Sequence, residues 1–181
     1  MEKRVSRGQW LMREPAKFQK LSKIILLGCL ICMSCAANEF DMADRVVIRK
    51  ADRQLLLMKD GSVLRTMDVA LGLLPKGDKK EEGDFHTPEG SYQLIKRNPA
   101  SEFFLSIQIS YPNKVDIREA RALGVDPGGQ IMIHGQPNKP KHSVAYYQQT
   151  DWTDGCIAVS NADMVDIWLM TSADTPVLIS P

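Results

Sequence analysis

A histidine and a cysteine in this sequence have the residue types and the local settings of a nucleophile and its base. His134 ends the apolar run at 131–133, and Cys156 follows a glycine twenty-two residues later. Cysteine attacks acyl groups as its thiolate, and a thiol needs a neighbouring imidazole or an electropositive setting to ionise at neutral pH. The pattern therefore predicts nucleophilic acyl chemistry, with Cys156 as the nucleophile and His134 as its base.

The glycine before the cysteine has a chemical reason of its own. Without a Cβ, Gly155 lets the backbone approach a substrate carbonyl and turn amide N–H groups toward the oxyanion of a tetrahedral intermediate. Removal of one such donor typically lowers the rate by about a hundredfold to a thousandfold. We therefore expect an oxyanion hole at this position.

A structural interpretation of the same residues stays open. Cys156 could be a small buried apolar residue, and His134 a buried histidine with a satisfied hydrogen bond. A free thiol in an oxidising compartment is a liability unless it is used, however, and a glycine lies beside each candidate. The other histidines, His86 and His142, match no common zinc spacing with these residues, so we expect no metal and no cofactor. His86 is expected in a loop that contacts the substrate.

The first 35 residues are typical of an export signal. They carry seven Lys and Arg against two acidic residues, and their apolar run at 24–34 is shorter than the about 20 residues that span a bilayer. Cys29 and Cys35 each follow a small residue, as in bacterial lipoprotein signals, so plain cleavage and lipidation both stay open. Met12 is an alternative start. A core helix is disfavoured because amphipathic spacing is missing. We expect a periplasmic or envelope protein.

The remaining residues, 36–181, are expected to form one globular domain. The whole chain is 44% hydrophobic and 25% charged. Residues 36–181 hold 16 Lys and Arg against 20 Asp and Glu, a net charge of −4, so the sequence offers no basic patch to nucleic acid. Every Asp, Glu, Lys or Arg beyond Lys141 is acidic. The surroundings of Cys156 should therefore attract amines better than phosphates.

Short strands dominate the elements that must position these residues. Helical patterns cover 115–123, with Gly124 as the C-cap, and run from Ser160 or Asn161 to 170. Asp60-Gly61 is a hairpin signal. The sequence predicts a mainly β fold, a sandwich-like arrangement of two sheets with one or two short helices. The expected strands are 45–50, 53–59, 62–71, 91–95, 104–109, 130–133, 157–159 and 176–180.

Two segments are expected to be loops. Residues 75–85 hold seven charged side chains in eleven positions with two glycines, which predicts a solvated loop. Residues 136–151 are polar, carry prolines and show no clear periodicity, so we expect a lid or a substrate-binding loop there. Trp152 should pack at the edge of the site, and Tyr146 and Tyr147 could supply a hydroxyl.

The motifs in this order resemble the L,D-transpeptidase catalytic domain, the YkuD-like family of bacterial cell-wall enzymes. The resemblance covers roughly residues 45–180, and its pieces are specific together rather than singly. They are Gln54-Leu55, Thr87-Pro88-Glu89-Gly90, Pro127-Gly128-Gly129, Ile131-Met132-Ile133-His134-Gly135 and Thr153-Asp154-Gly155-Cys156-Ile157.

The resemblance implies a two-step exchange on peptidoglycan stem peptides. The cysteine of the family attacks the carbonyl of the third stem residue, usually meso-diaminopimelate, and expels the terminal D-alanine to leave a thioester, from which an amine takes the acyl group. Carried over, Cys156 is the nucleophile and His134 the general base and acid. Gly135 orients the histidine, and the amides of Gly155 and Cys156 contribute to the oxyanion hole.

Two positions depart from the family pattern. The family commonly has a second histidine directly before the Gly-Cys pair, where this chain has Asp154, and an arginine two residues after the cysteine, where it has Ala158. His134 is then the only nearby base, and a cation that could hold a substrate carboxylate is missing. We expect Thr153 and Asp154 to bind the substrate.

The sequence leaves the acceptor open. Transfer to a second stem forms a crosslink, transfer to a lysine of an envelope protein attaches that protein, and transfer to water makes an L,D-carboxypeptidase or amidase-type hydrolase. A further alternative is an inactive envelope lipoprotein that binds peptidoglycan, in which Cys156 is unreactive. Papain-like folds and cell-wall endopeptidases place the cysteine before the histidine, and sortases use an arginine after the cysteine, which this chain lacks.

Overall fold

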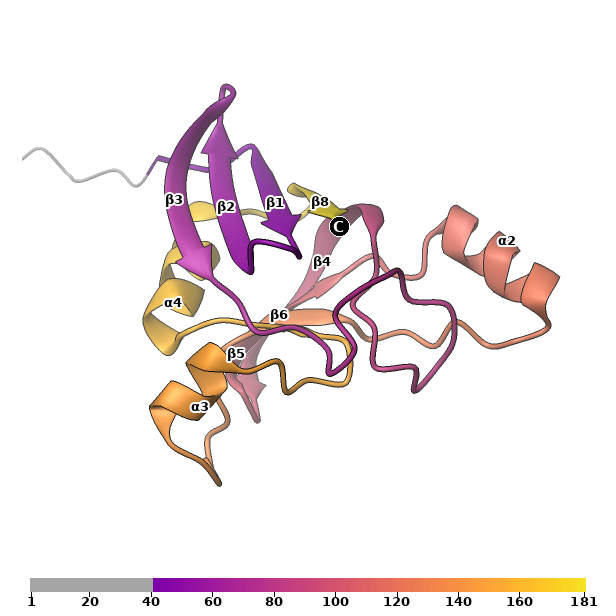
Figure 1. The fold of residues 1–181 in the computed structure, drawn as a ribbon. Helices are drawn as coiled ribbons and strands as arrows, with labels where there is room; N and C mark the ends of the chain where they lie inside the picture. The colour runs from indigo at the N-terminus through magenta and orange to yellow at the C-terminus, as the bar shows by residue number, and fades with distance from the viewer. Residues whose placement is uncertain (1–40) are drawn as a thin grey trace, which may run out of the picture. The chain divides into compact units, whose positions relative to one another are not determined.

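The computed structural model describes residues 41–181, so the predicted export signal lies outside the described residues. Eight strands form one sheet in the order β3-β2-β1-β8-β4-β5-β6-β7 (Figure 1). The strands are β1 (Arg45–Arg49), β2 (Gln54–Lys59), β3 (Ser62–Asp68), β4 (Gly90–Ser101), β5 (Phe104–Ile109), β6 (Met132–His134), β7 (Ile157–Ala158) and β8 (Pro176–Ser180); the helices are α2 (Lys114–Leu123), α3 (Val144–Gln149) and α4 (Asn161–Met170).

The long strand β4 joins the two halves of the sheet. Its residues 90–93 pair with β8, and from Leu94 to Ser101 it pairs with β5, with register irregularities along the second stretch. β1 and β8 run parallel, as do β6 and β7, whereas the other neighbouring strands are antiparallel. The predicted mainly β fold is confirmed. The two sheets that we expected are the two halves of one continuous sheet, because β4 is long enough to serve both.

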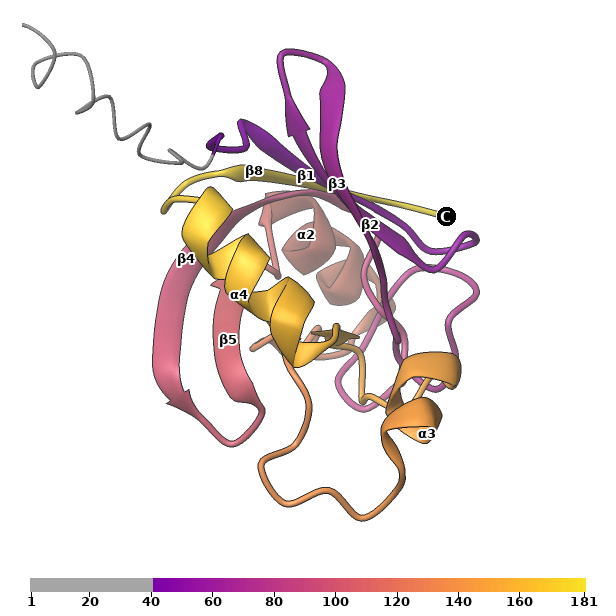
Figure 2. The same cartoon turned by 90° about the vertical axis from the view of Figure 1, so that its left-hand side faces the viewer.

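A single hydrophobic core fills the space between the two halves and α4. Inward-facing residues alternate along the strands, as Val46 and Ile48 do in β1. From α4, Met164, Ile167 and Met170 are buried in the same cluster. Figure 2 shows α4 lying across the opening between the β1–β8 side and the β4–β5 side. The helix therefore closes the core on the side that the bent sheet leaves open.

Local signals end the elements where the sequence predicts. Asp60 and Gly61 both have positive φ, 50° and 79°, as a two-residue hairpin of the I′ kind requires. Gly124 ends α2 in the left-handed conformation with φ 74°. Ser160 caps α4, since its hydroxyl accepts a hydrogen bond from the amide of Asp163.

The prediction of an irregular lid at 136–151 is wrong for part of that segment. Residues Val144–Gln149 form α3, which Ser143 caps and whose residue Tyr147 is buried. The described chain thus has three short helices rather than one or two. None of these helices has the length and apolar character needed to cross a membrane.

Candidate active site

His134 and Cys156 lie on neighbouring strand paths. His134 ends β6, and Cys156 directly precedes β7, which pairs with β6 in parallel so that His134 lies opposite Ala158. Opposite residues of a ladder share a face, as do alternate residues along a strand. Ile133 and Ile157 fill the core face. The backbone therefore directs His134 and Cys156 to the other face together.

The imidazole of His134 is buried and held in one orientation. Its Nδ1 lies 2.8 Å from the carbonyl oxygen of Gly135, which can only accept, so Nδ1 carries the proton and Nε2 has the free lone pair. The rings of Phe103 and Trp152 pack against it, with centroids 4.7 Å and 5.6 Å away. Burial lowers the pKa of His134 to about 4, although the contact with Gly135 opposes the shift. The imidazole is therefore a neutral base at neutral pH.

The thiol of Cys156 is also uncharged at rest. Burial raises the pKa of Cys156, and the carboxylate of Asp154 raises it further, while the Met132 amide and the Lys79 ammonium oppose the shift. The sulfur lies 3.8 Å from the carbonyl oxygen of Gln130, to which the thiol donates. Burial therefore favours the uncharged form of both the thiol and the imidazole at neutral pH.

The hydroxyl of Thr153 makes two hydrogen bonds within the turn before Cys156. This hydroxyl donates to the carbonyl of Cys156 at 2.7 Å and accepts from the amide of Gly155 at 3.2 Å. Thr153 is itself 4% exposed. Its side chain therefore shapes the turn, and its expected contact with substrate stays a prediction. The amide of Gly155 is thus engaged inside the turn. The expected oxyanion hole at Gly155 and Cys156 stays a prediction.

Gly155 is required by its conformation and by its neighbours. Its φ is 125°, and a Cβ at this position would lie 2.6 Å from the backbone oxygen of His86. Gly72 is equally confined, since its Cβ would lie 2.1 Å from the backbone oxygen of Phe85 and 3.1 Å from the Cα of Gly155. The loop of His86 thus packs on the turn through its backbone. The side chain of His86, expected to contact substrate, keeps a buried Nδ1 without a hydrogen-bond partner among the described residues.

The segment 70–73, which follows β3, bonds to the turn at 153–156 on the side opposite β6. We call this turn the cysteine turn. Ala70 exchanges two backbone hydrogen bonds of 2.8 Å with Ala158, and Leu71 and Leu73 bond to the backbone of Thr153. Asp151 braces the same junction, because its carboxylate accepts from the amide of Leu71. The cysteine turn therefore lies between two extended segments, each bonded to it through the backbone.

The Asp151 carboxylate also binds a cation. The guanidinium of Arg53 donates to both of its oxygens, with distances of 2.8–3.1 Å. Trp152, the next residue, donates from its indole nitrogen to the carbonyl of Tyr147 at 3.1 Å. Trp152 therefore links α3 to the imidazole, and its place at the edge of the site agrees with the sequence-based expectation.

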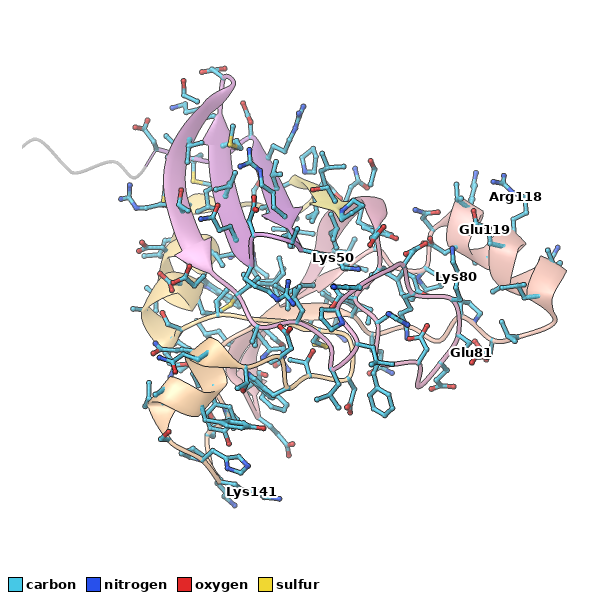
Figure 3. All side chains as sticks on the ribbon, viewed as in Figure 1. Lys50, Lys80, Glu81, Arg118, Glu119 and Lys141 are labelled. Atoms are coloured by element: carbon cyan, nitrogen blue, oxygen red, sulfur yellow. The ribbon has the colours of Figure 1, made fainter. Side chains whose placement is uncertain are left out.

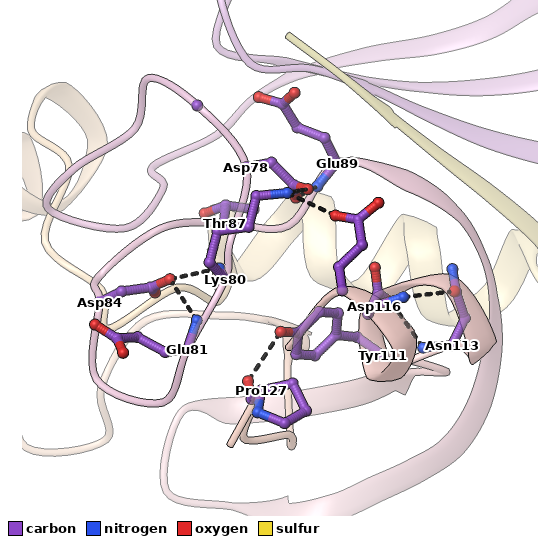
Figure 4. A network of polar contacts seen from close by, with 12 residues as sticks. Asp78, Lys80, Glu81, Asp84, Thr87, Glu89, Tyr111, Asn113, Asp116 and Pro127 are labelled. Atoms are coloured by element: carbon purple, nitrogen blue, oxygen red, sulfur yellow. Dashed lines mark hydrogen bonds and ion pairs between the residues drawn. The ribbon is translucent and has the colours of Figure 1, made fainter. Parts of the chain in front are cut away.

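The charged loop at 75–85 is more ordered than a solvated loop. Asp84 accepts hydrogen bonds from the amides of Lys80 and Glu81 (Figure 4). It also accepts from the amide of His86 and from the ammonium of Lys79. Burial opposes ionisation of Asp84, but these donors lower its pKa to about 2. Lys79 is only 5% exposed. The prediction of a solvated loop is therefore wrong for this pair.

Two further ion pairs fix the loop to the fold. Figure 3 shows Lys50 between the strands and the loop, and Lys80 beside Glu119 of α2. The buried Lys50 ammonium donates to the carbonyls of Gly77 and Thr87 and to the carboxylate of Glu89. Lys80 bonds to Glu119 at 2.9 Å. The loop that supports Gly155 is thereby tied to both the sheet and α2.

Two cavities are lined by residues that neighbour His134 or Cys156, and we call them the imidazole-side and the thiol-side cavity. The imidazole-side cavity has about 560 Å³, and Phe103 and Trp152 line it together with Tyr147 of α3. Lys139 and Lys141 lie on its rim, Lys141 near the outer tip of the segment before α3 (Figure 3). The thiol-side cavity has about 400 Å³ and is lined by Lys79, Glu82, Gly128, Gly129, Ile131, Asp154 and neighbours.

Comparisons with known proteins decide the family. Residues 43–179 match the family model of the L,D-transpeptidase catalytic domain, YkuD. This chain belongs to the L,D-transpeptidase catalytic domain family. YafK of Escherichia coli strain K12 is 42% identical over 62 residues, which are 33% of this chain and 23% of that protein.

Solved structures have the same fold as this L,D-transpeptidase-family domain. The helical cell shape determining protein Pgp2 from Campylobacter jejuni has a TM-score of 0.57 and 25% identity, with 80% of this chain and 51% of that chain covered. An L,D-transpeptidase from Mycobacterium smegmatis has a TM-score of 0.50 at 15% identity, with 75% and 58% covered, and shows the fold alone. The chain thus spans about half of Pgp2 and less of YafK.

Sequence reasoning missed several residues that shape this L,D-transpeptidase-family site. Arg53, Lys50 and Lys79 carry its charged contacts, and Phe103 packs on the imidazole. The charge-rich loop gave the one usable signal for Lys79, because cations and carboxylates alternate there. The remaining three belong to no pattern that points to the site, and only the folded chain brings them there.

Proposed function

We propose that this protein is a cysteine-dependent acyltransferase that acts on peptidoglycan stem peptides as an L,D-transpeptidase. Membership of the family supports the reaction class. The single observation that carries the proposal is a free cysteine beside a strand whose last residue is a neutral, oriented histidine. The whole reaction is part of this proposal and not a finding, because the chain covers only part of the length of its relatives.

The reaction starts from the neutral pair. As the sulfur of Cys156 attacks the carbonyl of the third stem residue, its proton passes to Nε2 of His134, and the amide of Cys156 receives the oxyanion. When the C–N bond to the terminal D-alanine breaks, His134 returns the proton to the leaving amine, and a thioester with Cys156 remains. An amine or water then attacks the thioester, gives a proton to His134 and releases the sulfur as the thiol.

The two charge-bearing cavities suit peptides with amines and carboxylates. The leaving amine must lie near His134, so the terminal D-alanine is placed in the imidazole-side cavity, where Lys139 and Lys141 can attract its carboxylate. The same cavity admits the acceptor, because His134 must also take the acceptor's proton. The partners are then a donor stem and an amine on a second stem or on an envelope protein, in the periplasm or cell envelope.

Product analysis tests the proposal. Purified protein is incubated with disaccharide tetrapeptides, with and without an added D-amino acid, and the products are identified by mass spectrometry. We expect release of D-alanine, an acyl-enzyme mass on Cys156 and an exchanged product when the amine is present. Cys156→Ala should abolish all three, whereas Ser62→Ala, an exposed change on β3, should not.

Other outcomes would change the assignment. Release of D-alanine without an exchanged or crosslinked product at any amine concentration would make the protein an L,D-carboxypeptidase. Binding of the muropeptide with no released D-alanine and no adduct on Cys156 would contradict the enzymatic proposal and leave a peptidoglycan-binding protein. Unchanged turnover in Cys156→Ala would exclude the thioester.

A further inference from the structure

Ser106 of β5 has a buried hydroxyl without a hydrogen-bond partner. The residue is 1% exposed, and its Oγ bonds to no donor or acceptor among the described residues. Buried hydroxyls are usually paired, because burial without a hydrogen bond disfavours the fold. Thr175, between α4 and β8, is buried to 4% exposure and bonds to both the amide and the carbonyl of Ser172. The hydroxyl of Ser106 therefore needs a reason other than the stability of the resting fold.

The strand register places Ser106 beside His134. The two residues lie directly opposite each other in the antiparallel ladder of β5 and β6. The next opposite pair along the ladder is hydrogen-bonded, since the amide of Gly135 donates to the carbonyl of Leu105 at 3.1 Å. Hydrogen-bonded and non-hydrogen-bonded pairs alternate, so Ser106 and His134 form a non-hydrogen-bonded pair, the kind whose side chains lie closer together. Their side chains therefore adjoin on one face of the sheet.

The imidazole of His134 must become a cation in this buried setting. In the proposed reaction it accepts the proton of the thiol, and burial disfavours the charged ring and lowers its pKa. The carbonyl of Gly135 accepts from Nδ1, and the rings of Phe103 and Trp152 pack against the imidazole without offering a hydrogen-bond acceptor. No carboxylate among the described residues contributes to the pKa shift. The hydroxyl oxygen of Ser106 is therefore a polar group beside the ring that no other contact occupies.

We propose that the hydroxyl of Ser106 stabilises the protonated form of His134 that arises during acyl transfer. As the S–H bond of Cys156 breaks and its proton bonds to Nε2, the hydroxyl turns its oxygen lone pairs toward the positive ring. The proton later passes from Nε2 to the leaving amine, and Ser106 itself gains and loses no atom. Ser106 acts through the imidazole and not on the substrate, so it is a positioning residue. The inference rests on the proposed function.

Kinetics and stability of Ser106→Ala test this inference together. The variant should lower kcat for D-alanine release about tenfold and leave KM unchanged, because the ring is neutral when the substrate binds and charged in the transition state. In urea the same variant should unfold at an equal or higher midpoint than the parent, since an unpaired buried hydroxyl is removed. The control Thr175→Val, which removes a paired buried hydroxyl, should lower the midpoint and keep kcat.

Alkylation of Cys156 by iodoacetamide tests the path through the imidazole without any stem peptide. The sulfur bonds to the methylene carbon, iodide leaves, and the thiol proton passes to His134. At pH 7, Ser106→Ala should slow alkylation about tenfold in the parent protein. In a His134→Phe background the same change should have no further effect, because the ring that it acts on is gone. Equal effects of Ser106→Ala in both backgrounds would show that the serine acts by another route.

Three further results would overturn the inference. One is an unchanged kcat and alkylation rate in Ser106→Ala. The second is a fall of its urea midpoint as large as that of Thr175→Val, which would show that the hydroxyl is hydrogen-bonded in the resting fold. The third is a rise in KM at unchanged kcat, which would mean contact with the substrate. If the parent protein releases no D-alanine, the proposed function fails, and the alkylation rates of the four proteins of the His134 and Ser106 cycle decide the inference alone.

Discussion

Asp154 influences the thiol of Cys156 through its charge. A carboxylate near a thiol disfavours the thiolate, and burial disfavours it more strongly. In the proposed reaction, Cys156 therefore stays protonated until His134 accepts its proton. Since His134 is itself neutral, proton transfer needs no prior ion pair, and the resting site carries neither charge of the reacting pair.

Replacement of Asp154 should make the thiol more acidic. In a pH titration of the parent protein followed by the ultraviolet absorbance of the thiolate, we expect Cys156 to ionise at a pH above that of a free cysteine, whose pKa is about 8.5. Asp154→Asn should lower the pKa of Cys156 and speed its alkylation by iodoacetamide at pH 7, with Asp174→Asn as the control. An unchanged or higher pKa in Asp154→Asn would show that the carboxylate does not act on the sulfur.

Among the elements, the loop between β3 and β4 depends on a buried charge. Lys50 donates to two loop carbonyls and to Glu89, so its loss leaves the buried carbonyl of Thr87 and two part-buried oxygens without this donor. Thr87, one of these partners, also accepts the amide of Gly72 with its hydroxyl at 3.0 Å. Because Gly72 packs on Gly155, a loss of order in this loop would also disturb the turn before Cys156.

Lys50→Met should therefore destabilise the fold more than a surface change does. Removal of one partner of a buried ion pair typically costs about 3–5 kcal/mol, and urea unfolding measures the loss of free energy. Lys50→Met with Glu89→Gln should recover part of it, because no unpaired carboxylate remains. Lys96→Met, an exposed change on β4, should have little effect. A loss in Lys50→Met no larger than that of Lys96→Met would refute the structural role of this ammonium.

Elements whose signals are local were predictable from the sequence, whereas those that depend on distant partners were not. The hairpin at Asp60-Gly61 and the helix ends at Gly124 and Ser160 follow from single residues and their conformations. α3 has no such signal beyond Ser143, and its buried residue Tyr147 packs on Trp152, with ring centroids 5.1 Å apart. That contact forms only in the folded chain, so the sequence indicated a loop.

At the scale of the whole molecule, local signals identified the two candidate site residues but not the parts of the fold that hold them in place. His134 and Cys156 were identifiable because each adjoins a glycine and ends or begins an apolar run. The continuity of the sheet through β4 and the burial of Lys79 were not, since both depend on pairings between segments far apart in the chain. The neutral state of the reacting pair likewise follows from burial, which no motif records.

Burial of a neutral histidine also links the stability of the whole fold to pH. The pKa of His134 is about 4 in the folded protein against an ordinary value of 6.5, so between these pH values the unfolded chain binds more protons. The stabilisation is therefore complete above pH 6.5 and is lost as the pH falls toward 4. Asp84, with a pKa of about 2 against 3.8, adds a second loss as the pH falls from 3.8 to 2.

The free energy of unfolding in urea should accordingly fall between pH 7 and pH 4.5 in the parent protein. His134→Phe, which cannot titrate, should flatten this slope even if it lowers stability at pH 7. Asp84→Asn should keep the slope between pH 7 and pH 4.5 and lose only the decrease at lower pH, because its carboxylate titrates below the imidazole. Equal slopes for the parent and His134→Phe over the upper range would mean that the imidazole is not held neutral by the fold, and the base would then have to be sought elsewhere.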